Sequence, residues 1–143
     1  MPPVAAPPLP LAVRAADLPP DAVGLCWQGG DWDPSRSIPE RLMPPLCRAP
    51  AFSLVAAPTA LPVLNPEGCP MDMQRTAALV AGAALVVTVD TLIAHLAGTL
   101  GRPTWLLLKN DADWRWPGEG ERTPWYPSVR IFRQHRPGKA RAA

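Results

Sequence analysis

The stretch from Leu85 to Gly101, LVVTVDTLIAHLAGTLG, limits the possible folds more than any other part of the chain. Its first five residues, Leu85 to Val89, are apolar or β-branched without alternation, which predicts a strand buried on both faces. Asp90-Thr91 then opens a predicted helix from Leu92 to Leu100, and Gly101 ends this helix as its C-cap. A buried strand that leads directly into a helix is typical of a parallel sheet with helical crossovers.

The rest of the chain repeats this alternation of short apolar runs with helical stretches. Further strands are predicted at Ala22 to Trp27, Phe52 to Ala56, Thr104 to Leu108 and Val129 to Phe132, while Leu61 to Leu64 is either another strand or a loop. Helices are predicted from about Ile38 to Arg48, where Pro44-Pro45 must shorten or kink the helix, and from near Asp72 to about Gly82. Ser37 and Glu40 have capping-box spacing for the first of these helices. The predicted architecture is an α/β fold, a Rossmann-like parallel sheet sandwiched by helices.

Proline distribution predicts where the folded domain begins. Seven of the 21 prolines fall within the first 20 residues, and such a segment is typical of an extended linker. Residues 1–21 are therefore expected to form a disordered linker or tail, residues 22–135 the folded domain, and residues 136–143 a basic disordered tail.

Composition and cysteine spacing exclude several classes of protein. Charged residues make up 18% of the chain and the net charge is +2, a balance too mild for a nucleic-acid binder or a polybasic membrane surface. Three widely spaced cysteines without zinc-type spacing favour a reducing compartment and predict no metal site, and Cys26, within an apolar run, is expected to be a buried structural thiol. No apolar run reaches the roughly 18 residues of a membrane span. The N-terminus lacks signal-peptide features, so we expect a soluble cytoplasmic protein without a transmembrane segment.

The turn at Asp90-Thr91 is the first candidate site, because ligands of such sheets bind at the carboxyl ends of the strands. A helix that begins at Leu92 offers free backbone amides and the positive end of its dipole, which suit a diphosphate. The Thr91 hydroxyl can add a donor, and His95 lies on the same helix face one turn further along. The alternative is structural: Asp90 only caps the helix, and His95 is a satisfied core histidine.

Two other segments hold candidate residues. Gly29-Gly30 follows the first strand, and glycine lets a backbone approach a ligand closely, although a plain tight turn explains the pair equally well. Arg36 can reach a phosphate or simply face solvent. The loop after Leu108 offers the possible contacts Lys109, Asp113, Trp114 and Arg115. Its aromatic residues either stack on a base or sugar or hold the loop to the domain, with the second role favoured for Trp116 and Trp125.

The order of these motifs resembles a known family. VDTLIAHLAGTLGRPTWLLL, followed by DWRW and then TPWYPSVRIFRQ, is similar to the C-terminal end of heptosyltransferase-like proteins of glycosyltransferase family 9, in the branch often fused to tetratricopeptide repeats. Upstream, GLCWQGG, RSIP and FSLV resemble the first strand, glycine loop and next strand of the same domain. The resemblance covers about residues 22 to 135 and is specific from Leu85 to Gln134.

This resemblance implies the C-terminal half of a GT-B glycosyltransferase, which holds the nucleoside diphosphate sugar that serves as donor. Asp90, Thr91 and His95 match the motif that contacts the diphosphate and sugar of the donor, and Gly29 and Arg36 match positions lining the same pocket. No metal or other cofactor is implied. The sequence departs from the family at Lys109 and Ala112, where prolines are usual, and the stretch from Ala57 to Met71 is short.

The catalytic base of the family belongs to its N-terminal domain, and no residue of this chain is a candidate for that role. We therefore expect a nucleotide-sugar-binding domain that is inactive as an isolated chain. Its expected partner is an N-terminal Rossmann-like or tetratricopeptide-repeat domain on another chain. The alternative is a non-catalytic remnant that binds a nucleotide or a protein. A nicotinamide-dependent oxidoreductase is disfavoured, because the GxGxxG fingerprint is missing.

Overall fold

A computed structural model of the 143-residue chain describes residues 15–29, 37–69, 72–108, 123 and 126–133. Its strands are β1 (Val23–Cys26), β2 (Ala51–Ser53), β3 (Leu85–Val89), β4 (Thr104–Leu108) and β5 (Val129–Arg133). The α-helices are α1 (Met73–Gly82) and α2 (Leu92–Thr99), and two short 3-10 helices are η2 (Glu40–Leu42) and η3 (Pro44–Cys47). The predictions for β3 and β4 are confirmed to the residue, and those for the other strands and α1 to within a few residues.

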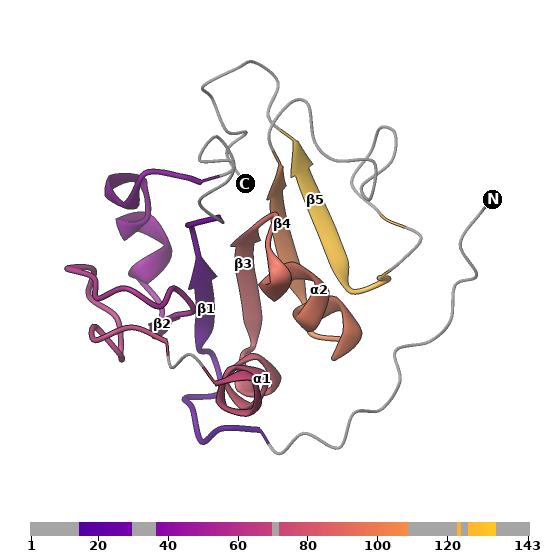
Figure 1. Cartoon of the computed structure of the whole chain (residues 1–143), viewed down its shortest axis with the longest axis horizontal. Coiled ribbons are helices and arrows are strands. Elements are labelled where there is room, and N and C mark those ends of the chain that lie inside the picture. The colour runs from indigo at the N-terminus through magenta and orange to yellow at the C-terminus, as the bar shows by residue number, and fades with distance from the viewer. Residues whose placement is uncertain (1–14, 30–36, 70–71, 109–122, 124–125, 134–143) are drawn as a thin grey trace.

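The five strands form one parallel sheet in the order β2-β1-β3-β4-β5 (Figure 1). From β1 the chain moves outward to β2, and it then returns past β1 to build the other side of the sheet. The helix α2 packs against β3, β4 and α1 and lies in front of β3 and β4 in Figure 1. The predicted Rossmann-like α/β fold is confirmed.

The helix α2 has defined ends that explain why it spans these eight residues. Its C-terminus is a Schellman motif, in which the Arg102 amide donates to Ala97 O over 3.0 Å and the Gly101 amide to Gly98 O over 3.1 Å. Gly101 has a φ of 68°, a left-handed conformation that glycine adopts at little cost. The helix thus ends one residue earlier than predicted, with Leu100 as its C-cap.

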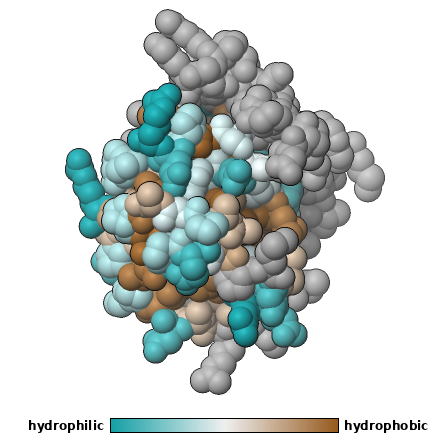
Figure 2. Space-filling view, turned by 60° about the vertical axis from the view of Figure 1, so that its left-hand side comes forward, coloured by the Kyte–Doolittle hydropathy of each residue, from teal (hydrophilic) through white to brown (hydrophobic). Residues whose placement is uncertain are grey.

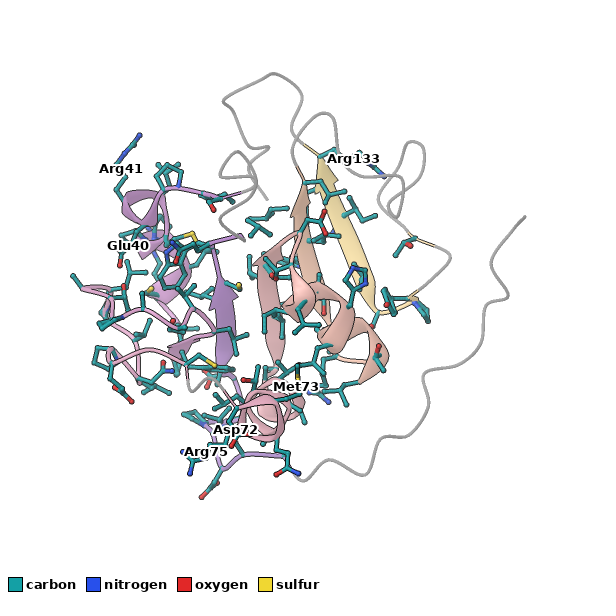
Figure 3. All side chains as sticks on the ribbon, in the orientation of Figure 1. Glu40, Arg41, Asp72, Met73, Arg75 and Arg133 are labelled. Atoms are coloured by element: carbon teal, nitrogen blue, oxygen red, sulfur yellow. The ribbon has the colours of Figure 1, made fainter. Side chains whose placement is uncertain are left out.

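A single arginine joins α2 to the end of α1. The Arg102 guanidinium donates to the Ala83 carbonyl through both Nε and Nη2, over 3.1 and 2.7 Å. Ala83 is the C-cap of α1, so the cation lies at the negative end of that helix dipole. At the opposite end of α1, the Asp72 carboxylate caps the amides of Gln74 and Arg75. Figure 3 shows Asp72, Met73 and Arg75 together there, below the sheet, whereas Arg133 lies at its top.

The segment between β1 and β2 differs from the sequence prediction. A capped helix from Ile38 to Arg48 was expected, but the structure has η2 and η3 instead, and η2 has Pro39 as its N-cap with no side-chain cap. The capping-box prediction for Ser37 and Glu40 is therefore wrong. Pro44-Pro45 removes two backbone donors that a continuous helix needs, which explains the break.

Residues 54–69 cover the exposed edge of β2. The Asn65 side chain accepts from Ser53 N over 2.6 Å and donates to Ser53 O over 2.9 Å, so one amide group pairs with both polar atoms of an edge residue. The Leu64 amide donates to Ala51 O over 2.8 Å. The segment Leu61 to Leu64 is a loop, the second of the two alternatives, and it shields a strand edge from pairing with another chain.

Apolar side chains fill both faces of the sheet. The larger cluster surrounds β1, β2 and β3, and its largest fully buried members are Phe52, Leu25, Val80, Val86 and Val87. A smaller cluster lies under α2, where Ala94 meets Leu106, Leu108, Val129 and Ile131. On the side that carries β2, apolar residues reach the surface between polar ones (Figure 2).

The described part of the predicted N-terminal tail lies against α1. Within residues 15–21, the Ala16 amide donates to Ala78 O over 2.8 Å, and Leu18 packs on the larger cluster. A Cβ atom on Gly82 would lie 2.7 Å from Ala16 O, so this approach depends on glycine. Residues 1–14 and 136–143 lie outside the described part of the chain.

Candidate functional site

The candidate site lies where β1 and β3 end side by side. Cys26, the last residue of β1, is in register with Thr88 of β3, so Gln28-Gly29 and Asp90-Thr91 leave the sheet next to one another. The chain turns outward after β1 and toward the opposite edge after β3, which makes this position the topological switch point, the usual ligand site of such sheets. We call the two strand ends and the start of α2 the switch-point site.

The start of α2 is built around Thr91. This residue is the N-cap, with extended backbone angles (φ −144°, ψ 178°), and its Oγ1 accepts from the Ile93 amide over 3.1 Å. The Ala94 amide donates to Thr91 O over 3.1 Å. The remaining one of the first three amides of α2, the Leu92 N–H, has no acceptor within the described part of the chain, and the Leu92 residue is 60% exposed. The helix dipole adds a partial positive charge at the same point.

Three side chains at the strand ends contact one another behind this amide. The Thr91 Oγ1 lies 3.4 Å from Thr88 Oγ1 and 3.8 Å from Cys26 Sγ. Burial raises the pKa of the Cys26 thiol, whereas its hydrogen bonds with Thr91, Thr88 and Gln28 act in the opposite direction. A neutral thiol therefore faces the helix start and adds no negative charge there. The apolar run around Cys26 predicted its burial, but nothing in the sequence indicated its contact with Thr91.

The end of β1 is closed by Ser37. The Gly29 amide donates to Ser37 Oγ over 2.8 Å, and the Ile38 amide donates to Trp27 O over 2.8 Å. Ser37 thus holds the two ends of the loop after β1 together. The sequence pattern predicted Ser37 as a helix cap and did not indicate this role. Gly30 and Arg36, which were predicted to contact the donor, lie outside the described residues.

His95 and Asp90 flank the helix start in different ways. The Nδ1 atom of His95 lies 3.1 Å from the Tyr126 hydroxyl, and the two rings meet edge to face with centroids 5.8 Å apart. Asp90 precedes the N-cap and is buried, with 8% of its surface exposed. Its carboxylate is favourable near the positive helix end. The structure therefore brings Gly29, Asp90, Thr91, Leu92 and His95 to one edge of the sheet or to the first turns of α2.

The predicted contacts Lys109, Asp113, Trp114 and Arg115, together with Trp116 and Trp125, also lie outside the described residues. Tyr126 is described and packs on α2, the holding role that was one reading of these aromatic residues. Within the described ranges, no group of three or more His, Cys, Asp or Glu side chains is placed to hold a metal ion. The helices in these ranges are also too short or too polar to cross a membrane.

The fold and this site define a class: a Rossmann-like α/β domain with a helix that starts at its topological switch point. The sequence model of glycosyltransferase family 9 (heptosyltransferase) matches residues 68–142. This match covers just over half of the chain and includes α1, β3, α2, β4 and β5. The chain belongs to glycosyltransferase family 9. No curated protein and no solved structure matches it.

Proposed function

We propose that the switch-point site binds the diphosphate of a nucleoside diphosphate sugar, the donor of a glycosyl transfer reaction. The observation that carries this proposal is the start of α2 directly at the carboxyl end of β3, beside the end of β1, in a glycosyltransferase family 9 domain. A diphosphate is a strong hydrogen-bond acceptor with negative charge. The Leu92 amide and the helix dipole supply a donor and positive potential at the same point.

Each residue of the site has a proposed role that follows from its chemistry. The Leu92 N–H donates to a phosphate oxygen, and Thr91 holds that amide in place by capping the helix. His95 donates to the diphosphate from one turn further along. The buried Asp90 carboxylate repels phosphate and accepts hydrogen bonds from hydroxyl groups, so we assign it to a sugar hydroxyl. Gly29 lets the β1 loop approach the ligand closely.

The base that deprotonates the acceptor hydroxyl is expected on a second domain, as the resemblance to GT-B enzymes implies. Inverting transfer needs such a base, and the roles proposed above for this chain cover donor binding alone. The requirement for a partner domain, and the cytoplasmic location, remain predictions from the sequence.

Calorimetric titration with ADP, GDP, UDP and CDP, and then with sugar conjugates of the nucleotide that binds, tests the proposal. The decisive variant is Leu92→Pro. Proline is favoured at the first helical position, and the extended Thr91 backbone suits the residue before a proline, so α2 is retained while the Leu92 N–H is removed. We expect Leu92→Pro to weaken binding at least 10-fold and the matched control Leu92→Ala to change it little.

His95→Ala is expected to weaken the same binding by about 1–3 kcal/mol, since a hydrogen bond to a charged group is lost. Circular dichroism checks that each variant keeps its helices. If none of the nucleotides binds with a sub-millimolar dissociation constant, the proposal is overturned and a non-catalytic domain is favoured. Unchanged affinity in both Leu92→Pro and His95→Ala would place the ligand elsewhere.

A further inference from the structure

The ring of Tyr126 lies over Gly98 on the surface of α2. A Cβ atom on Gly98 would lie 2.3, 2.6 and 2.8 Å from the Cγ, Cδ1 and Cδ2 atoms of Tyr126. The ring therefore occupies the space that any larger residue at position 98 would need. Because Gly98 lies three residues after His95, the ring over Gly98 extends along the helix face that carries the imidazole.

The backbone around Tyr126 is tied to the sheet. The Val129 amide donates to Tyr126 O over 3.2 Å, and the Thr104 amide donates to Ser128 O over 3.0 Å. Tyr126 also packs against the smaller apolar cluster under α2. The phenol is thus held by the start of β5 at one end and by the helix surface along its ring, which fixes where its hydroxyl can lie.

That hydroxyl lies 3.1 Å from Nδ1 of His95. A phenol is a good hydrogen-bond donor and a poor acceptor, because its oxygen lone pairs are delocalised into the ring, whereas an unprotonated imidazole nitrogen is a good acceptor. The favourable arrangement has the Tyr126 O–H donating to Nδ1. In a neutral imidazole the other nitrogen, Nε2, then carries the proton and can act only as a donor.

We infer that Tyr126 is a positioning residue for His95: its hydroxyl selects the Nε2–H tautomer and fixes the ring, so that the imidazole presents a donor to the phosphate oxygens. A diphosphate offers only acceptors, so the opposite tautomer with an unprotonated Nε2 would oppose binding. The role of this tautomer in ligand binding rests on the proposed function. The tautomer of His95 itself is a property of the protein without ligand.

Nuclear magnetic resonance of the full chain labelled with ¹⁵N-histidine tests the tautomer without any ligand. The chain has two histidines, and His135→Asn identifies the His95 signals. At a pH where imidazole is neutral, we expect the wild type to show one tautomer, Nε2–H, and Tyr126→Phe to show a mixture. The phenylalanine ring still fills the space over Gly98, so the fold is retained. A Nδ1–H tautomer in the wild type, or the same tautomer population in Tyr126→Phe, would overturn the inference.

A second experiment measures the consequence for binding, with the nucleoside diphosphate that binds best among ADP, GDP, UDP and CDP. Tyr126→Phe is expected to weaken binding by roughly 3- to 10-fold in the wild-type background, the range for one net hydrogen bond, and not at all in the His95→Ala background. An equal loss in both backgrounds would show that Tyr126 acts independently of His95 and would overturn the positioning role. If none of the four nucleotides binds, the proposed function fails, while the tautomer result still decides whether Tyr126 orients His95.

Discussion

The two strands that meet at the switch point are neighbours in one sheet, yet the chain leaves them by different means. After β3 the backbone enters α2 within two residues, and a single side chain, Thr91, caps the helix. After β1 the chain enters a loop that Ser37 closes by accepting from Gly29, and two 3-10 helices follow in place of an α-helix. Equivalent positions in the sheet thus carry a regular structure on one side and an irregular one on the other.

The difference separates two tasks. A helix start supplies a dipole and oriented amides, so under the proposed function the β3 side provides the groups that attract the diphosphate. The β1 side supplies a buried neutral thiol, glycine at the loop and a covered sheet edge. Its structure depends on particular side-chain contacts, such as Asn65 with Ser53. We expect substitutions of positive-φ glycines, which strain the backbone, to destabilise the domain more in the β1–β2 half than in the β3–β4 half.

The largest effect is predicted for Gly68→Ala, compared with Gly101→Ala. Both glycines have positive φ, 104° and 68°. A Cβ atom on Gly68 would also lie 2.3 Å from the Ala56 carbonyl oxygen, so strain and a clash with the backbone add together. Urea unfolding should show a loss of about 3 kcal/mol or more for Gly68→Ala and about 1 kcal/mol for Gly101→Ala. A larger loss at Gly101 would contradict the comparison.

The same contrast explains how far the sequence predicted the structure. The stretch from Leu85 to Leu108 combines strongly apolar strands with a helix and a C-terminal glycine, so local signals and tertiary structure agree there. The boundaries of β3 and β4 were predicted to the residue. Between Ser37 and Arg48 the capping-box spacing indicated a helix, but Pro44-Pro45 breaks it, because two missing backbone donors outweigh a favourable cap.

The site was predictable in the same uneven way. A strand followed by Asp90-Thr91 and a helix predicts where backbone amides and a helix dipole lie, because both follow from the secondary structure, but it leaves open whether Asp90 and His95 bind a ligand or have only structural roles. The contacts of Ser37 with Gly29, of Cys26 with Thr91 and of Tyr126 with His95 join residues that are 8, 65 and 31 positions apart. No local pattern encodes such pairs, since each depends on how the chain folds back on itself.

A smaller effect is predicted for the two hydroxyl side chains that close the strand ends. Thr91→Ala removes a helix cap and is expected to lower the free energy of unfolding by about 1 kcal/mol. Ser37→Ala removes the partner of the half-buried Gly29 amide, which water can replace, and is expected to cost about 0.5 kcal/mol. Chemical denaturation measures both, with Thr91→Ser as the control that retains the cap. A greater cost for Ser37→Ala would mean that the β1 loop, rather than the helix start, holds the two strand ends in place.

The smallest effect concerns the thiol where the two halves meet, because it vanishes at neutral pH. Burial raises the pKa of Cys26 above its value in the unfolded chain. The folded state therefore keeps its proton where the unfolded chain has lost it, and this contribution to stability is fully present below the unfolded pKa and is lost as the pH rises through the folded pKa. We expect the stability of the wild type relative to Cys26→Ala to fall as the pH rises into the alkaline range, measured by urea unfolding at a series of pH values. Burial also raises the pKa of Cys47, but that residue is only half-buried and solvent screens its charge. Cys47→Ala should therefore remove less of the fall in stability at alkaline pH than Cys26→Ala does. An equal effect of the two variants would mean that the junction between Cys26 and Thr91 is as open to water as the surface of η3.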